Sequence, residues 1–255
     1  MNSINLLAAS RERPERLINV LKKWIDFSSD RKKISIIISI DSSDSTIDDY
    51  KKKLDDLSIE SGVRITLIVN DNKNTVEAIN RCKSHIDGDL IFIISDDTDC
   101  FPQWDKDIND VTKKNDYFII KTSDGIGTDL ITMPIFSRGY LENKDYIYYP
   151  EYEHMFCDTE LTCVASIENC VIDATHLIFK HLHYTKGYNK KDEVDLKNQD
   201  TFYGGMDIFK KRMDDFFGIK KNNRIGVIPQ QINKWIIENY HTEDENKNAE
   251  SETDK

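Results

Sequence analysis

The feature that most constrains this chain is a short apolar run that ends in a cluster of carboxylates, between Leu90 and Asp99. Residues 90–94 are all apolar, and an uninterrupted run of this length is typical of a strand buried on both faces of a parallel sheet. Asp96, Asp97 and Asp99 follow directly. Open α/β sheets bind ligands at the carboxyl ends of their strands, so these aspartates could hold a divalent cation and a diphosphate. A solvated acidic turn is the alternative for this segment alone.

The segments before this run alternate between strand and helix patterns. Strand patterns cover residues 4–9, 34–40 and 63–69, and helical patterns cover residues 14–27, 47–57 and 75–85. Pro14 suits the first turn of its helix, and Ser45 or Thr46 can cap the second helix. This alternation predicts βαβ units with right-handed crossovers. We therefore expect an α/β fold with a mostly parallel central sheet flanked by helices.

Polar side chains gather where each of these predicted strands ends. The candidate ligand groups are Ser10, Arg11, Arg13, Asp41, Asp44, Asp71, Asn74 and Asp96. The carboxyl ends of parallel strands lie along one edge of a sheet, so we expect these groups to converge on one nucleotide-sized crevice. The glycine motifs of dinucleotide-binding folds, P-loop NTPases and α/β-hydrolases do not occur in the sequence. A diphosphate bound here would therefore depend on a metal rather than on a glycine cradle.

The second half of the chain is less regular. Its patterns predict helices over residues 102–114, around Leu161, over 198–217 and over 232–240, and strands over 117–121, 171–173 and 176–183. We expect the aromatic run from Tyr146 to Tyr152 to pack against the sheet, with stacking on sugars as the alternative. Trp104 is expected in the core below the acidic loop. Arg212, with Lys210 and Lys211, is expected on a solvated helix face.

Composition and charge limit the function and the surroundings. The net charge of −11 argues against nucleic acid as a partner, because phosphate backbones require a basic surface. Five cysteines without a CxxC pair indicate free thiols in a reducing compartment. The N-terminus lacks the features of a signal peptide, and no apolar run is long enough for a transmembrane segment. We therefore expect a cytoplasmic protein. Residues 1–240 are expected to form one domain, with a first half (1–101) that supplies the nucleotide-sized crevice and a second half (102–240), followed by a disordered acidic tail (241–255).

Four motifs in this order carry a resemblance to a known family. They are Ala9–Leu17 after the first strand, Ile40–Thr46 after the second, Ser95–Asp99 with Pro102 and Trp104, and Phe156–Leu161 with the later His181-Leu-His183. With these motifs the chain resembles a family-2-like glycosyltransferase of the GT-A fold. The third motif resembles the metal-binding DXD region of that family, and the fourth resembles its catalytic helix and late histidine.

The resemblance implies an inverting transfer of a sugar, of hexosyltransferase type, from a nucleotide-diphosphate donor to a glycan or polysaccharide acceptor. A UDP-sugar is the expected donor, and Mn²⁺ or Mg²⁺ is the expected cofactor, held by Asp97, Asp99 and His183. His181 is the alternative histidine. The expected donor nucleotide contacts are Ser10, Arg11, Arg13, Asp41, Asp71, Asn74 and Asp96.

The catalytic base implied by the resemblance is Asp158. Glu160 is two residues away, so on a helix the two side chains point about 200° apart and only one can face the cleft. Two other functions stay open. One is a GT-A-shaped binding protein without catalysis, and the other is a nucleotidyltransferase that makes sugar nucleotides, although the glycine-rich first loop of that class is absent.

Overall fold

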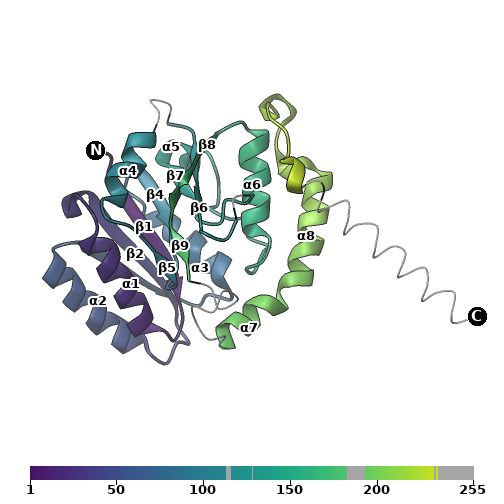
Figure 1. Ribbon diagram of the computed structural model, residues 1–255. Helices are drawn as coiled ribbons and strands as arrows, with labels where there is room; N and C mark the ends of the chain where they lie inside the picture. The colour runs from purple at the N-terminus through teal and green to yellow at the C-terminus, as the bar shows by residue number, and fades with distance from the viewer. Residues whose placement is uncertain (113–115, 128, 183–192, 233, 235–255) are drawn as a thin grey trace, which may run out of the picture.

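The central element of the fold is a seven-stranded sheet with the order β3-β2-β1-β4-β7-β6-β8 (Figure 1). The computed structural model describes residues 1–112, 116–127, 129–182, 193–232 and 234. β1, β2, β3 and β4 are mutually parallel, β7 runs antiparallel to both neighbours, and β6 and β8 are parallel. The predicted α/β fold with a mostly parallel sheet is therefore confirmed.

The elements have the following bounds. The strands of the central sheet are β1 (Ile4–Ser10), β2 (Ile34–Asp41), β3 (Arg64–Asn70), β4 (Leu90–Ile93), β6 (Ile119–Ser123), β7 (Ile135–Ser137) and β8 (Val171–Ile178). The helices are α1 (Pro14–Asp26), α2 (Ile47–Ser61), α3 (Thr75–Arg81), α4 (Trp104–Val111), α5 (Arg138–Glu142), α6 (Cys157–Ile167), α7 (Glu193–Asp200) and α8 (Phe202–Asp214). Short 3₁₀ turns are η1 (Arg31–Lys33), η2 (Cys82–His85), η4 (Phe216–Gly218) and η5 (Lys221–Asn223). None of the helices within the described ranges is long and apolar enough to cross a bilayer.

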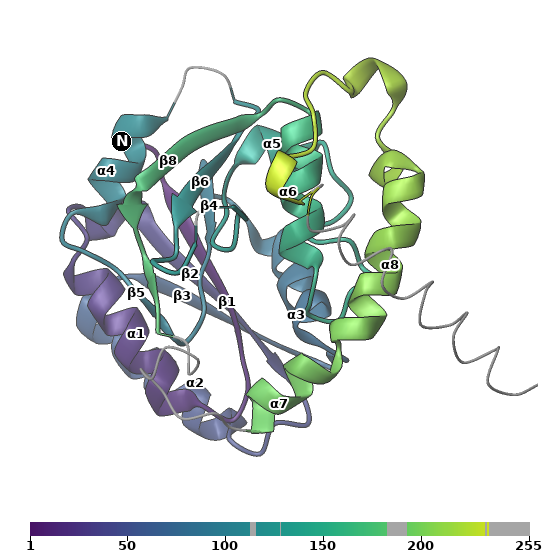
Figure 2. The same ribbon diagram turned by 45° about the vertical axis from the view of Figure 1, so that its right-hand side comes forward.

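Alternate residues of the central strands enter two separate cores. Leu6 and Ile38 pack with α1, α2 and α4 on one face, whereas Leu7 and Ile37 pack with α3, α5, α6 and α8 on the other (Figures 1 and 2). A strand buried on both faces needs apolar residues at every position. This requirement explains the uninterrupted apolar runs in the sequence.

An aromatic cluster fills the first core below the acidic loop. Trp24, Phe92, Trp104 and Phe179 are fully buried, with ring centroids 4.9–6.3 Å apart. The indole N–H of Trp104 donates to the Trp24 carbonyl at 2.8 Å. The prediction that Trp104 is a core residue is therefore confirmed.

The C-terminal half differs from the sequence predictions in two places. The predicted strands 171–173 and 176–183 are one strand, β8, followed by the short β9 (Lys180–His181). The predicted helix 198–217 is two helices, α7 and α8, which meet at Thr201. The Thr201 hydroxyl accepts a hydrogen bond from the Met155 backbone N–H at 3.3 Å, which fixes the junction against the loop before α6. Residue 183, most of the predicted helix 232–240 and the acidic tail 241–255 lie outside the described residues.

A second, two-stranded sheet joins the two halves of the chain. β5 (Thr98–Asp99) pairs antiparallel with β9, so that Thr98 is opposite His181. The backbone N–H of Leu182 also donates to the Asp97 carbonyl at 2.7 Å. The acidic loop after β4 is therefore held by a segment more than eighty residues later in the chain.

Two adjacent glycines of α8, Gly204 and Gly205, provide a matched test of how closely this helix approaches Met155. A Cβ at Gly205 would lie 2.6 Å from the Met155 carbonyl oxygen, whereas a Cβ at Gly204 would meet nothing within 4 Å. We expect Gly205→Ala to lower the free energy of unfolding by about 1–3 kcal/mol through overpacking. Gly204→Ala should raise it by up to about 1 kcal/mol, because alanine favours the helix. Denaturant unfolding of both variants checks this, and equal effects would contradict the close approach of α8 to residue 155.

Candidate active site

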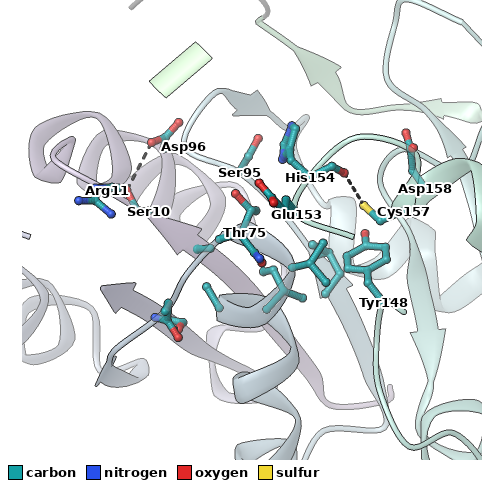
Figure 3. Close-up of a pocket in the computed structure, with 18 of the residues that line it drawn as sticks. Ser10, Arg11, Thr75, Ser95, Asp96, Tyr148, Glu153, His154, Cys157 and Asp158 are labelled. Carbon is teal, nitrogen blue, oxygen red and sulfur yellow. Dashed lines mark hydrogen bonds between the residues drawn. The ribbon is translucent and has the colours of Figure 1, made fainter. Parts of the chain in front are cut away.

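A cavity of about 460 Å³ lies at the carboxyl ends of β1, β2 and β4 (Figure 3). The first loop, the end of β2, the loop after β3 and the acidic loop all contribute to its lining. The start of α6, His181 of β9, Lys197 of α7 and Thr201 between α7 and α8 also line it. Ser10, Arg11, Arg13, Asp41, Asn74, Asp96, Asp97 and Asp158 of the sequence predictions all line this cavity. The predicted convergence on one sheet edge is therefore present.

Asp96 is the anchor of the first loop. Its carboxylate accepts a hydrogen bond from the Ser10 hydroxyl at 3.3 Å and lies 3.4 Å from Arg13 Nη1 and 3.5 Å from Arg16 Nε. Burial raises the pKa of Asp96 above its ordinary value, although the charges of both arginines oppose the shift. Asp96 thus holds two guanidinium groups at the rim of the cavity.

Asp97 forms a compact polar cluster with His181. The carboxylate is 3.1 Å from His181 Nε2 and 3.2 Å from Arg16 Nη2, and it accepts a hydrogen bond from Ser95. Burial raises the pKa of Asp97, but the hydrogen bond and charge of His181, together with Ser95 and Arg16, outweigh burial and bring it to about 2. Asp97 is therefore ionised throughout the neutral range.

Asp99 and His183, the other predicted metal ligands, are not part of this cluster as described. The Asp99 carboxylate forms an ion pair with Lys23 of α1, and Asp99 is not among the residues that line the cavity. Residue 183 lies outside the described residues. The structure thus places His181, the alternative histidine, beside Asp97.

We tested whether these residues suit a divalent ion. Among the described residues, no three His, Cys, Asp or Glu side chains form a group that could hold a metal alone. Asp97 and His181 nevertheless offer a carboxylate oxygen and an imidazole nitrogen at the cavity wall. Divalent ions in phosphate-transfer sites are commonly bound by one or two side chains and completed by substrate oxygens and water. The pair therefore fits an ion that is bound together with a diphosphate.

Asp41 and its neighbours form another part of the cavity wall. Asp41 accepts hydrogen bonds from the Ser43 backbone N–H at 2.7 Å and the Asn72 backbone N–H at 2.9 Å. Burial raises the pKa of Asp41, but these bonds, that of the Ser43 hydroxyl and the charge of Arg11 lower it below its ordinary value. Asn72 is buried, and its Oδ1 has no partner among the described residues. An unsatisfied acceptor beside the cavity suits a ligand N–H.

The remaining predicted donor contacts have different surroundings. Arg11 donates to the Ser43 hydroxyl at 3.2 Å and lies 3.9 Å from Asp41. Asn74 lines the cavity but also caps α3, because its side chain accepts from the Glu77 backbone N–H at 2.9 Å. Asp71 is exposed and is not part of the cavity wall. The residue of this loop that faces the cavity from a buried position is Asn72.

Asp158 and Glu160 have opposite surroundings, although both are in the first turn of α6. Asp158 lines the cavity, and burial raises the pKa of its carboxyl above the ordinary value. Glu160 is 4% exposed and binds Arg212 of α8 at 2.7 Å and the Tyr152 hydroxyl at 2.9 Å. Of the two carboxylates, only Asp158 therefore faces the cleft.

The prediction that Arg212 lies on a solvated helix face is wrong. Its side chain is 14% exposed and its guanidinium lies 3.7 Å from the centre of the Tyr149 ring. Tyr148 and Tyr152 are buried in the second core, and Tyr148 also lines the cavity, so both packing and contact with a ligand stay open for residues 146–152. The nearest sequence signal was the Glu160–Arg212 charge pair, but two oppositely charged residues on different helices cannot be matched without the fold.

Sequence reasoning also missed Arg16, Tyr50 and Asn72. The Tyr50 hydroxyl is 2.7 Å from the Ser10 hydroxyl and accepts from the Arg13 backbone N–H at 3.0 Å. Burial raises the pKa of Tyr50 to about 12. Arg16 could have been found, because residues three apart in the first turn of a helix share a face, and Arg13 was already a candidate.

The chain was compared with proteins of known structure. It superposes on a mannosyltransferase from Pyrobaculum calidifontis, PcManGT, solved with GDP-Man and Mn²⁺, with a TM-score of 0.58 and 10% identity over 73% of this chain and 59% of that chain. It superposes on residues 1–349 of Staphylococcus aureus TarS, solved with UDP-GlcNAc, with a TM-score of 0.56 and 11% identity over 90% of this chain and 82% of that chain. The protein has the GT-A glycosyltransferase fold.

A third solved structure has the same fold. Glucosyl-3-phosphoglycerate synthase from Mycobacterium tuberculosis, solved with Mn²⁺, UDP and phosphoglyceric acid, gives a TM-score of 0.52 and 12% identity over 77% of this chain and 74% of that chain. This GT-A chain spans just over half of the PcManGT chain and 36% of a longer TarS chain. No protein-family model and no curated protein sequence matches it.

The contribution of the Glu160–Arg212 ion pair to stability can be tested by substitution. We expect Glu160→Ala to lower the free energy of unfolding by roughly 3–5 kcal/mol, because it leaves a buried guanidinium without its counter-ion. Arg212→Ala should have a comparable effect, and the double variant should lose less than the sum. Denaturant unfolding of the three variants measures this coupling. Additive losses would show that the pair does not act as a unit.

Proposed function

We propose that this protein is a metal-dependent, inverting glycosyltransferase that moves a sugar from a nucleotide-diphosphate donor to a glycan acceptor. The observation that carries the proposal is the composition of one cavity in a GT-A fold. One end of it holds Asp97 and His181, and the other end holds Asp158, a partly buried carboxyl. The glycosyltransferases of this fold named above were solved with UDP, UDP-GlcNAc or GDP-Man.

The donor nucleotide would occupy the side of the cavity formed by the first three strands. Asp41 offers an acceptor edge for the base, and Asn72 Oδ1 offers a second acceptor. Two buried acceptors side by side suit a base edge that carries N–H donors. Uracil has one such donor, its ring N3–H, which could donate to one of these acceptors, and we assign it as the base on the resemblance to glycosyltransferases that use UDP-sugars. Arg11 and Arg13, on the first loop, would bind the phosphates.

The diphosphate would be held where Asp97 and His181 meet. A divalent ion bound there, Mn²⁺ or Mg²⁺, supplies Lewis-acid stabilisation of the negative charge on the leaving diphosphate. Arg16 lies 3.2 Å from Asp97 and adds a fixed positive charge that needs no reorganisation during the reaction.

Asp158 would act as the general base. It takes the proton of the acceptor hydroxyl while that oxygen forms a bond to the anomeric carbon. The bond between this carbon and the diphosphate oxygen breaks in the same step, and its electron pair leaves with the diphosphate. A direct displacement of this kind inverts the anomeric configuration. Glu160 is held by Arg212 and Tyr152 and takes no part in this step.

The acceptor would reach Asp158 from the second half of the chain. A second cavity, of about 340 Å³, also includes Asp158 and is lined by Leu130, Phe156, Phe202 and Ile232 among others. Asp158 is thus shared by both cavities. This position suits the residue that links a donor on one side to an acceptor on the other.

The neighbouring aspartates Asp97 and Asp99 provide a matched test of the donor site. We expect UDP to bind in the presence of Mn²⁺ and to bind at least about tenfold more weakly to Asp97→Asn, because a carboxylate at the ion is lost. Asp99→Asn should bind UDP like the original protein, since Asp99 pairs with Lys23 outside the cavity. Calorimetric titration of UDP, GDP, CDP and UMP, with and without Mn²⁺, measures this and identifies the base.

Two results of that titration would contradict the proposal. If no nucleoside diphosphate binds to the folded protein in Mn²⁺, the donor site does not exist. If Asp99→Asn loses binding while Asp97→Asn keeps it, the assignment of the metal position is wrong. Diphosphate binding without any release of UDP from a UDP-sugar would favour a binding protein without catalysis.

The Asp158→Asn variant tests the base. We expect it to lower transfer by about 10²–10⁴-fold, which is typical of a lost general base, while UDP binding stays unchanged. The folded-state pKa of Asp158 is above its ordinary value, so its ionisation destabilises the fold progressively as the pH rises from the unfolded pKa to that raised pKa, and by a constant amount above it. The variant should therefore be more stable than the original protein at neutral pH, and the gain should vanish as the pH falls below the unfolded pKa of about 4.

Kinetics and thermal unfolding across pH separate the two roles of Asp158. A base with a raised pKa also places the acidic limb of the rate profile above the range of an ordinary aspartate. A variant that is inactive and less stable at neutral pH would indicate a structural role instead.

A further inference from the structure

One segment of this acidic protein is basic. Residues 210–224 contain six Lys or Arg against Asp214 and Asp215, a net charge of +4, which leaves −15 on the rest of the chain. Arg212 is paired with buried Glu160, but Lys211, Lys220 and Lys221 are exposed. Lys211 in the last turn of α8, and Lys220 and Lys221 after this helix, therefore give this stretch of an acidic chain a local excess of exposed positive charge.

The same stretch exposes large apolar side chains. Phe216 is 47% exposed, Ile225 71% and Val227 81%. We call residues 210–228 the basic-apolar loop. It emerges from the end of α8 that is remote from α7 (Figures 1 and 2). Scattered single apolar residues are normal on a surface, but three of them beside exposed lysines in one loop are not typical of a solvated face.

The basic-apolar loop is fixed to the protein at both ends. Arg212 Nη2 donates to the Phe217 carbonyl at 2.8 Å, and the backbone N–H groups of Ile225 and Gly226 donate to the Ile167 carbonyl at 2.8 and 2.7 Å. Gly226 approaches α6 so closely that a Cβ would lie 2.0 Å from the Ser166 carbonyl oxygen. The backbone that carries these apolar residues is therefore hydrogen-bonded to α6, and their side chains point to the surface.

The two adjacent phenylalanines show how the backbone divides this loop. Phe216 and Phe217 both have positive φ, 48° and 56°, which is a costly conformation for bulky residues. Phe217 is buried against Phe209, whereas Phe216 lies under the guanidinium of Arg224 at 4.0 Å from the ring centre. The turn thus buries Phe217 and leaves the preceding residue, Phe216, at the surface beside the Arg224 guanidinium.

We propose that the basic-apolar loop docks on an anionic lipid surface. Exposed lysines beside Phe, Ile and Val suit the headgroup region of a bilayer, where the charges meet anionic lipids and the apolar side chains enter the boundary with the acyl chains. The charge balance favours this segment as the contact, because the rest of the chain has a net charge of −15 and is repelled by the same membrane. Asp214 and Asp215 reduce the attraction without cancelling it.

Docking through this loop would bring the lipid surface close to Asp158. The loop is anchored at Ile167, at the C-terminal end of α6, and Asp158 is in the first turn of the same helix. Nine residues of helix separate the two, about 14 Å at 1.5 Å per residue. The proposal does not depend on the transferase reaction, because it concerns binding to lipid alone.

The test is co-sedimentation of the full chain with vesicles, without nucleotide. We expect binding to phosphatidylcholine–phosphatidylglycerol vesicles, weak binding to pure phosphatidylcholine, and loss of binding at high salt. Lys220→Glu with Lys221→Glu should weaken binding by more than about tenfold, since each basic residue near an anionic surface contributes about fivefold. Ile225→Ser with Val227→Ser should weaken it by about tenfold or more.

Matched substitutions on α2 control for charge and exposed apolar area. Ile59 is 83% exposed and Lys52 is exposed, so Ile59→Ser with Lys52→Glu should leave vesicle binding unchanged. Thermal unfolding confirms that each variant is folded. The proposal is overturned if the original protein ignores anionic vesicles at low salt, or if the α2 variant loses as much binding as the loop variants. Equal binding to both vesicle types would also overturn it.

Discussion

The site depends on the compensation of two adjacent carboxylates at the end of β4. Asp96 is 5% exposed, and the side chain of Asp97 is 12% exposed. Two buried negative charges this close would be strongly unfavourable without cations. Arg13, directly before α1, and Arg16 of α1 supply positive charge to Asp96, and Arg16 and His181 supply it to Asp97. The first helix and a late strand are thus both drawn to the same loop.

This compensation also sets the shape of the cavity. Because α1 presents its arginines to the acidic loop, the first loop lies across the end of β1, with Ser10 bonded to Tyr50 and Asp96. Because β9 pairs with β5, the second half of the chain closes over the same edge. The two cavities meet at Asp158, which lines both of them. A single electrostatic requirement therefore brings together segments that are distant in the sequence.

The first half of the fold (residues 1–101) could be predicted from the sequence, and much of the later half could not. Parallel strands buried on both faces produce long apolar runs such as Ile34–Ile40, which are unambiguous. The second half contains shorter elements whose ends are fixed by tertiary contacts, such as the break between α7 and α8 at Thr201. The positions of the predicted strand ends correctly indicated which loops lie together at one edge of the sheet. They did not predict that Asp99 would turn toward Lys23, or that Asn72 rather than Asp71 would face the cavity, because one-residue differences in a turn reverse the direction of a side chain.

The same limit applies to Asp158 and Glu160. The sequence favoured Asp158 as the carboxylate that faces the cleft, but it could not exclude Glu160. Helix geometry separates their directions, yet only the neighbours decide which carboxylate can exchange a proton. Glu160 is fixed by Arg212, which contacts Tyr149 and the Phe217 carbonyl as well, so its charge is permanently matched. The Asp158 carboxylate has local hydrogen bonds from Thr159 and no ion pair within the described residues. Burial without a counter-ion raises its pKa and increases its affinity for a proton, which is the property that a general base requires. The Glu160–Arg212 pair thus supports the proposed role of Asp158, since it holds the other carboxylate of this turn away from the cavity.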